Sequence, residues 1–124
     1  NYGADVGKIV IGVLIDRSEI TEWNNGEQIK VSQKKLDDVF KGIDVCGIKI
    51  DVENYEYYTL KGGVNIIKTH NPIIYCELWD NKNRSKCFEL ILSLNYKIYV
   101  LIKDKLENYD PSKHDKQNFF FIPS

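Results

Sequence analysis

The chain has 124 residues, of which 43% are hydrophobic and 28% charged, a composition typical of one globular domain rather than of a disordered or fibrous protein. Lys and Arg number 17 and Asp and Glu number 18, giving a formal net charge of -1, so we expect no nucleic-acid partner. The longest apolar run, residues 9–15, is too short to span a bilayer, and we expect no membrane association.

The residue counts also indicate whether the chain is a whole protein and in which cellular compartment it is found. The chain contains no Met and begins with Asn1, so we expect an upstream part of the protein to be missing from it. Its cysteines, Cys46, Cys76 and Cys87, are odd in number and lack C-x-x-C spacing, which argues against a disulfide framework or a zinc site. Thiols of this kind indicate a cytoplasmic or other reducing intracellular compartment.

The first third of the chain predicts two strands and a short helix. Residues 8–15 form a nearly continuous apolar run typical of a strand, and residues 28–32 alternate polar and apolar as a half-buried strand does. A short helix is expected over residues 33–40, with Ser32 as its N-cap.

From residue 45 onward, apolar strand patterns alternate with amphipathic helix patterns. The predicted strands are 45–52, 72–79, 97–103 and 118–123, and the predicted helices are 53–69 and 82–94. A polar loop is expected between the last two strands. Gly62 and Gly63 each weaken the first helix by about 1 kcal/mol relative to Ala, or they allow it to approach the sheet closely.

This order predicts an α/β fold. The first three of these strands can be parallel, joined by right-handed helical crossovers, and the last two can form an antiparallel hairpin. We therefore expect one half of a doubly wound sheet with an antiparallel edge. The domain spans residues 1–124, with leading strands and a short helix in 1–44 and the alternating core in 45–124.

Acidic residues follow two of the predicted strands. Asp51 and Glu53 end the first, and Glu77 and Asp80 end the second. Because ligands of open α/β sheets bind beyond the carboxyl ends of the strands, these acids could bind a metal, act as a general base, or hydrogen-bond a polyhydroxyl or an amine. Trp79 would be a platform for the substrate or a core residue.

A purely structural interpretation of these acids is also open. Asp51 could cap the following helix, Glu53 could stand in the first turn of that helix, and Glu77 could pair with Lys49. Neither a dinucleotide fingerprint (G-x-G-x-x-G) nor a P-loop (G-x-x-x-x-G-K-[ST]) is present in the chain.

Residues 48–63, IKIDVENYEYYTLKGG, resemble the signature of FkbM-type methyltransferases, which reads roughly K-I-D-V-E-G-x-E-x-x-x-L-K-G-A. Residues 36–38 resemble the L-D-D element of this family, and residues 72–77 resemble its P-x-I-x-x-E strand. Two residues depart from the pattern. Asn54 stands where the family usually has Gly, a change that the tolerance of Asn for unusual backbone angles allows, and Gly63 replaces a usual Ala.

The resemblance implies the C-terminal half of a Rossmann-like class I methyltransferase with S-adenosylmethionine as its cofactor. It implies O-methylation of a hydroxyl on a sugar or small metabolite, with the glycine-rich cofactor loop upstream of the matched region. On this interpretation Asp51 and Glu53 are the candidate catalytic residues, Asp51 orienting the acceptor or acting as base, and Glu56 has either a catalytic or a structural role. Lys49 and Asp51 would contact the cofactor, and Glu77, Trp79 and Asp80 would border the acceptor pocket; no metal ligand is assigned.

Two alternatives stay open: a non-catalytic binding or assembly module that keeps half of the fold, and a metal-dependent hydrolase that uses the acid cluster. The expected partners are a small-molecule or glycan acceptor, together with the missing N-terminal half or a second copy of the chain. In a chain lacking that half, the strand at residues 45–52 would be an exposed sheet edge.

Overall fold

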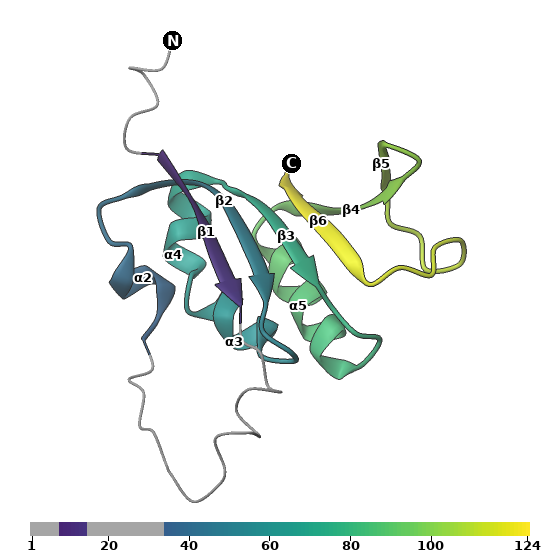
Figure 1. Cartoon of the computed structure of the whole chain (residues 1–124), viewed down its shortest axis with the longest axis horizontal. Helices are drawn as coiled ribbons and strands as arrows, with labels where there is room; N and C mark the ends of the chain where they lie inside the picture. Colours follow the sequence, from purple (N-terminus) through teal and green to yellow (C-terminus); the bar gives the residue numbers. More distant parts are fainter. Residues whose placement is uncertain (1–7, 15–33) are drawn as a thin grey trace, which may run out of the picture.

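The computed structural model describes residues 8–14, for which only the backbone is considered, and residues 34–124 (Figure 1). The strands are β1 (Lys8–Leu14), β2 (Asp44–Asp51), β3 (Ile73–Glu77), β4 (Tyr96–Ile102), β5 (Lys105–Asn108) and β6 (Asn118–Pro123). The helices are α2 (Leu36–Val39), α3 (Glu56–Lys61), α4 (Val64–His70) and α5 (Lys82–Ser93). The predicted strand at 28–32 and the N-cap Ser32 lie outside the described residues.

The strands form one mixed sheet in the order β1-β2-β3-β6-β4-β5. β1, β2 and β3 are parallel neighbours, whereas β6 is antiparallel to both β3 and β4. β5 pairs antiparallel with β4. The prediction of an α/β fold with parallel strands and an antiparallel pairing of the last two predicted strands is therefore confirmed.

Two predictions about the sheet are wrong. β2 is not an exposed edge, because β1 pairs with it over the whole of Lys8–Leu14. The segment after β4 is not a plain loop, because β5 follows it as a hairpin. The turn residues Lys103 and Asp104 have φ values of 47° and 67°, and positive φ at both positions is what a type I′ turn requires. β5 was missed because all four of its residues are exposed and carry no alternating pattern.

The single helix predicted over 53–69 is two helices, α3 and α4, which meet at Gly62 and Gly63. A Cβ atom on Gly63 would lie 3.3 Å from Cδ1 of Leu36, and one on Gly62 would lie 3.5 Å from Cβ of Lys35. The glycines therefore allow the close approach of the segment that begins α2, not of the sheet. The predicted helix at 33–40 is likewise shorter, since α2 has four residues.

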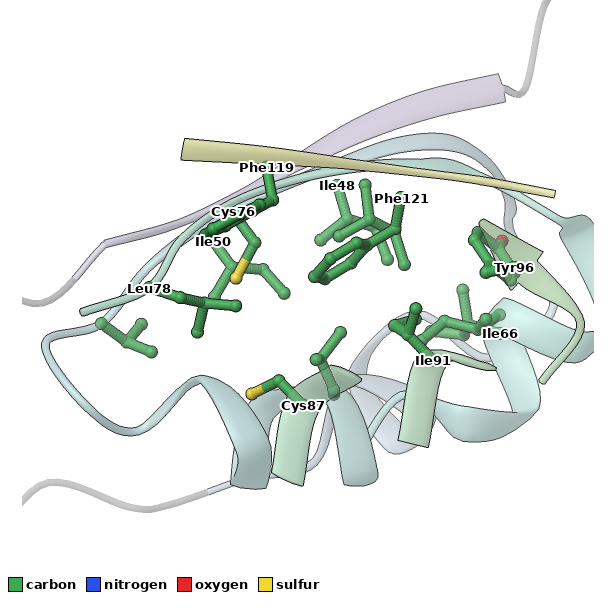
Figure 2. Packing of buried hydrophobic residues seen from close by; sticks show 14 of the residues in the cluster. Ile48, Ile50, Ile66, Cys76, Leu78, Cys87, Ile91, Tyr96, Phe119 and Phe121 are labelled. Carbon is green, nitrogen blue, oxygen red and sulfur yellow. The ribbon is translucent and has the colours of Figure 1, made fainter. Parts of the chain in front are cut away.

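The core lies between the sheet and the helices (Figure 2). Alternate side chains of β2, β3 and β6 point toward the helices, among them Ile48, Cys76 and Phe119, while Cys87 and Ile91 point back from α5 (Figure 2). The hydroxyl of Tyr96, which is buried, donates a hydrogen bond to the carbonyl oxygen of Pro72 at 2.7 Å. This packing holds the carboxyl ends of β2 and β3 side by side.

Candidate functional site

A small hollow lies where β2 and β3 end. It has no enclosed room for a water molecule, and its lining residues come from the ends of the two strands, the loops that follow them and the start of α3, namely Asp51, Glu53, Asn54, Glu56, Glu77 and Trp79. Because β2 and β3 are parallel neighbours, their carboxyl ends meet at one edge of the sheet, the edge at which α/β proteins bind ligands. Four carboxylates and one indole therefore converge at this place.

The loop after β2 has a backbone that few residues adopt. Glu53 and Asn54 are consecutive and both left-handed, with φ values of 46° and 77°. Each such residue other than glycine costs on the order of 1–2 kcal/mol unless local hydrogen bonds offset the strain. Asn54 is among the residue types that tolerate this region best, which agrees with its place where the resembled signature usually has Gly.

The carboxylate of Glu56 offsets that strain. Its Oε2 accepts hydrogen bonds from the backbone N–H groups of Val52 at 3.1 Å and Asn54 at 3.2 Å, and its Oε1 lies 3.0 Å from the same Asn54 nitrogen. The side-chain amide of Asn83 donates to Oε1 at 2.8 Å. Glu56 is only 2% exposed, so a buried charge is satisfied here by several N–H donors, as burial requires.

The loop after β3 is held by α5 and by the segment before β6. Asn81 is the N-cap of α5, and its side chain accepts a hydrogen bond from the backbone N–H of Arg84. The guanidinium of Arg84, 8% exposed, donates to the carbonyl oxygens of Leu78 at 2.8 Å and Lys116 at 3.2 Å. The chain before β6 is thereby fastened beside the end of β3.

The structure brings most of the predicted site residues together. Asp51, Glu53, Glu77 and Trp79 all line the hollow, and Trp79 is 41% exposed. Their catalytic and acceptor-binding roles stay predictions.

Two predicted site residues lie elsewhere. The side chain of Asp80 is 94% exposed and forms an ion pair with Arg84, at 3.5 Å between Oδ1 and Nη1, outside the lining of the hollow. Lys49 is exposed in the middle of β2. It alternates with Ile48 and Ile50, which are buried under the helices, so it points to the opposite face of the sheet.

The structural alternative for the acids is wrong in two respects. Asp51 does not cap the following helix, because α3 begins at Glu56 with Tyr55 at the N-cap position and no side-chain cap. Glu53 is not in the first turn of that helix but in the left-handed loop before it. The carboxylate that orders this loop is that of Glu56.

Sequence reasoning named Glu56 as a candidate structural residue but did not predict that it accepts hydrogen bonds from the loop. It missed Asn83 as the donor to Glu56 and Asn54 as a lining residue. The position of Asn54, in place of a usual Gly, was a usable signal for a left-handed residue. The link between Glu56 and Asn83 carried no signal, since the two residues are 27 positions apart.

The thiols near the hollow are not nucleophiles. Burial raises the pKa of Cys76 far above its ordinary value, and the nearby Cys87 and the carboxylate of Glu56 raise it further. Burial, with a contribution from Glu56, raises the pKa of Cys87 to about 12. Both thiols are therefore protonated at neutral pH and act as small apolar core residues.

The carboxylates of the hollow can accept hydrogen bonds from hydroxyl or amino groups, and one of them can accept a proton. Within residues 34–124, no group of three or more His, Cys, Asp or Glu side chains has the arrangement of a metal site. The described residues thus give the metal-dependent hydrolase alternative no ligand set.

Comparison with known families gives a match to the Methyltransferase FkbM domain over residues 13–110. The chain belongs to the FkbM methyltransferase family. No curated protein and no solved structure matches it significantly. The matched range of the FkbM domain contains every residue that lines the hollow, from Asp51 to Trp79.

The chemistry of the hollow suits groups that donate hydrogen bonds. S-adenosylmethionine, the methyl donor that the resemblance implies, carries hydroxyl and amino groups that carboxylates can bind. Pockets that enclose small molecules, however, usually measure about 300–1,000 Å³, whereas the hollow has no enclosed room for a water molecule. The described residues therefore offer hydrogen-bond acceptors at this edge, and they do not enclose a cofactor.

In the part of the FkbM domain that the structure describes, no helix has both the length and the apolar character needed to cross a membrane.

Proposed function

We propose that this FkbM domain takes part in an S-adenosylmethionine-dependent O-methyltransferase that acts on a hydroxyl of a sugar or small metabolite. The observation that supports this most is the convergence of Asp51, Glu53 and Glu77 beside a partly exposed Trp79 at the carboxyl ends of β2 and β3. Membership of the family supplies the reaction class.

In the proposed reaction, S-adenosylmethionine supplies an electrophilic methyl group when bound. The residues of this chain act on the acceptor. The Asp51 carboxylate accepts a hydrogen bond from the acceptor hydroxyl, orients its oxygen, and takes up its proton as the oxygen gains the methyl group. Glu53 and Glu77 bind neighbouring hydroxyls of the acceptor, and Trp79 covers its apolar face.

The test measures transfer of labelled methyl from S-adenosylmethionine to a panel of monosaccharides and small hydroxylated metabolites. We expect Asp51→Asn to lower kcat by at least about 100-fold, the low end of what a general base contributes. Asp104→Asn is the matched control, because Asp104 lies in the exposed β4–β5 turn with a positive φ that Asn also adopts; it should retain activity within about twofold.

The described residues of the hollow enclose no room for a small molecule, which favours one alternative, a non-catalytic binding or assembly module. Calorimetry with S-adenosylmethionine separates the two functions. Binding at or below millimolar cofactor, together with methyl transfer, supports the methyltransferase. If neither binding nor transfer is detected for the natural full-length protein, the methyltransferase proposal is overturned and the module is retained.

A further inference from the structure

Three asparagines connect the acidic loop to helix α5. We refer to Asn54, Asn81 and Asn83 as the asparagine bridge. Asn83 stands in the first turn of α5, where its Nδ2 donates to Oε1 of Glu56 at 2.8 Å and its Oδ1 accepts from the backbone N–H of Tyr57 at 3.3 Å. Nδ2 of Asn81 donates to Oδ1 of Asn54 at 2.8 Å.

The two parts of the asparagine bridge differ in depth. The contact of Asn83 with Glu56 is partly buried, and it fixes the carboxylate that holds the loop after β2. The contact of Asn54 with Asn81 is exposed, so it competes with water and contributes less. Asn83 is therefore the member on which the geometry of the loop depends most.

Through its side-chain amide, Asn83 also connects the segment that follows β3 to the segment that follows β2. It belongs to the helix that follows β3, and its partners Glu56 and Tyr57 belong to the helix that follows β2. Its third side-chain contact, from the thiol of Cys87 to Oδ1 at 3.9 Å, lies within α5. α3 and α5 lie next to each other on one side of the sheet (Figure 1). A shift of α5 would thus be transmitted to the loop that carries Glu53.

We propose that Asn83 is a positioning residue of the hollow, which acts through Glu56 to hold Val52–Asn54 in the conformation that places Asp51 and Glu53 together. The hydrogen bond from Asn81 to Asn54 is a second, exposed connection between α5 and the loop after β2. The expected effect of Asn83 on kcat rests on the proposed methyltransferase function. Its expected effect on the conformation of the loop does not. Displacements of about 1 Å in catalytic groups can cost on the order of 100-fold in rate, so such a residue affects kcat without contacting substrate.

Asn83→Asp tests the contact with Glu56 alone. The substitution keeps an oxygen for the Tyr57 N–H and replaces the donor to Glu56 by a second carboxylate oxygen. Two carboxylates at hydrogen-bonding distance cannot both be charged without strong repulsion, whereas a shared proton restores the contact. The variant should therefore lose the positioning at pH 8 and regain it near pH 6.

The carboxylates of Asp51, Glu53 and Glu77 line the same hollow as Glu56, so they add negative charge around this pair and increase the repulsion in the variant. The thiols of Cys76 on β3 and Cys87 on α5 stay protonated throughout this range, because burial raises the pKa of each. Lys61 and Lys86 lie over the ring of Tyr57, at 5.9 and 5.7 Å from its centroid.

The first readout does not require activity. Amide hydrogen exchange at Val52 and Asn54, whose N–H groups bind Glu56, is compared with the unsubstituted protein at the same pH. We expect at least about tenfold faster exchange in Asn83→Asp at pH 8 and near-normal exchange at pH 6. Asn108→Asp, which makes the same change at an exposed position of β5, should leave both amides unchanged.

The second readout is methyl transfer. Asn83→Asp should lower kcat at least about tenfold at pH 8, with KM for the acceptor within about threefold, and should recover toward pH 6. Asn81→Ser keeps an oxygen that can cap α5 but removes the donor to Asn54, and it should lower kcat by less than threefold. Unchanged exchange at Val52 and Asn54 in Asn83→Asp at both pH values would overturn the proposal. If the unsubstituted protein transfers no methyl group, the proposed function fails, and the exchange data alone decide the role of Asn83.

Discussion

At the scale of single residues, the acids of the hollow depend on a pair of left-handed residues and on the carboxylate that stabilises them. Glu53 and Asn54 would be strained in isolation, and Glu56 offsets this strain through the N–H groups of Val52 and Asn54. The placement of Asp51 and Glu53 at a strand end was predictable from an apolar run followed by charges. The role of Glu56 was not, because its burial depends on Asn83, which only the packing of α5 brings near.

Glu56→Gln should lower the free energy of unfolding by about 1–3 kcal/mol. The neutral amide keeps one acceptor oxygen. Its NH2 group, however, faces N–H groups that now donate hydrogen bonds to the second carboxylate oxygen, so these buried donors are left unsatisfied. Urea unfolding measures the change. The matched control is Glu89→Gln at an exposed position of α5, which should stay within about 0.5 kcal/mol of the unsubstituted protein. Equal effects at both positions would contradict the assigned role of Glu56.

At the scale of elements, the shortest helix acts as a cap for its neighbour. Asp37 of α2 accepts hydrogen bonds from the backbone N–H groups of Asn65 at 3.1 Å and Ile66 at 2.9 Å, and its own N–H donates to the carbonyl oxygen of Gly62. These N–H groups belong to the first turn of α4, where a helix lacks internal partners. The L-D-D element thus has a structural function within the family's fold.

The break between α3 and α4 shows why periodicity alone was insufficient. The apolar residues of 53–69 keep helical spacing across Gly62 and Gly63, so the pattern predicted one helix. The chain instead begins a new helix at Val64 because Asp37, nearly 30 positions away in sequence, supplies the cap. Long-range capping of this kind is invisible to a local pattern.

Asp37→Ala should destabilise the domain by about 1 kcal/mol, within the range of 0.5–2 kcal/mol for the loss of a helix N-cap. The neighbouring Asp38 is exposed, and Asp38→Ala should change the free energy of unfolding by less than about 0.5 kcal/mol. Thermal and urea unfolding of both variants give the comparison. A loss of the same size in Asp38→Ala would point to general charge effects instead of capping.

At the scale of the whole molecule, the alternation of strands and helices after residue 45 predicted the fold class and most elements. It did not predict the order of the strands. The insertion of β6 between β3 and β4 arises from the packing of Phe119 and Phe121, which are fully buried, and no local pattern encodes the choice of neighbours. The exposed β5 was missed for the related reason that its pairing involves backbone groups only.

The burial of thiols provides a test of this packing. Cys46 is exposed, whereas Cys76 and Cys87 are buried, and burial raises the pKa of Cys87 to about 12. A thiol reagent at pH 8 should therefore modify one cysteine per native chain and all three after unfolding, since only the thiolate reacts. Cys46→Ser should abolish the native reaction. Rapid modification of that variant would show that the core between β3 and α5 is open.

The position of β6 has a consequence for the order in which the sheet assembles. β4 and β5 precede β6 in the chain, yet among the described strands it is β6 that links them to the parallel strands. The β4–β5 hairpin can thus form early, but it cannot join the parallel strands until residues 118–123 pair between β3 and β4. The pairing of β6 with β3 joins segments that are distant in sequence, and such pairing is slow to form. Pulse-labelled hydrogen exchange during refolding should show protection at the junctions with β6 last, and protection there before the β4–β5 hairpin would contradict this order. The sheet is completed from its interior, by the strand that the chain supplies last among those described.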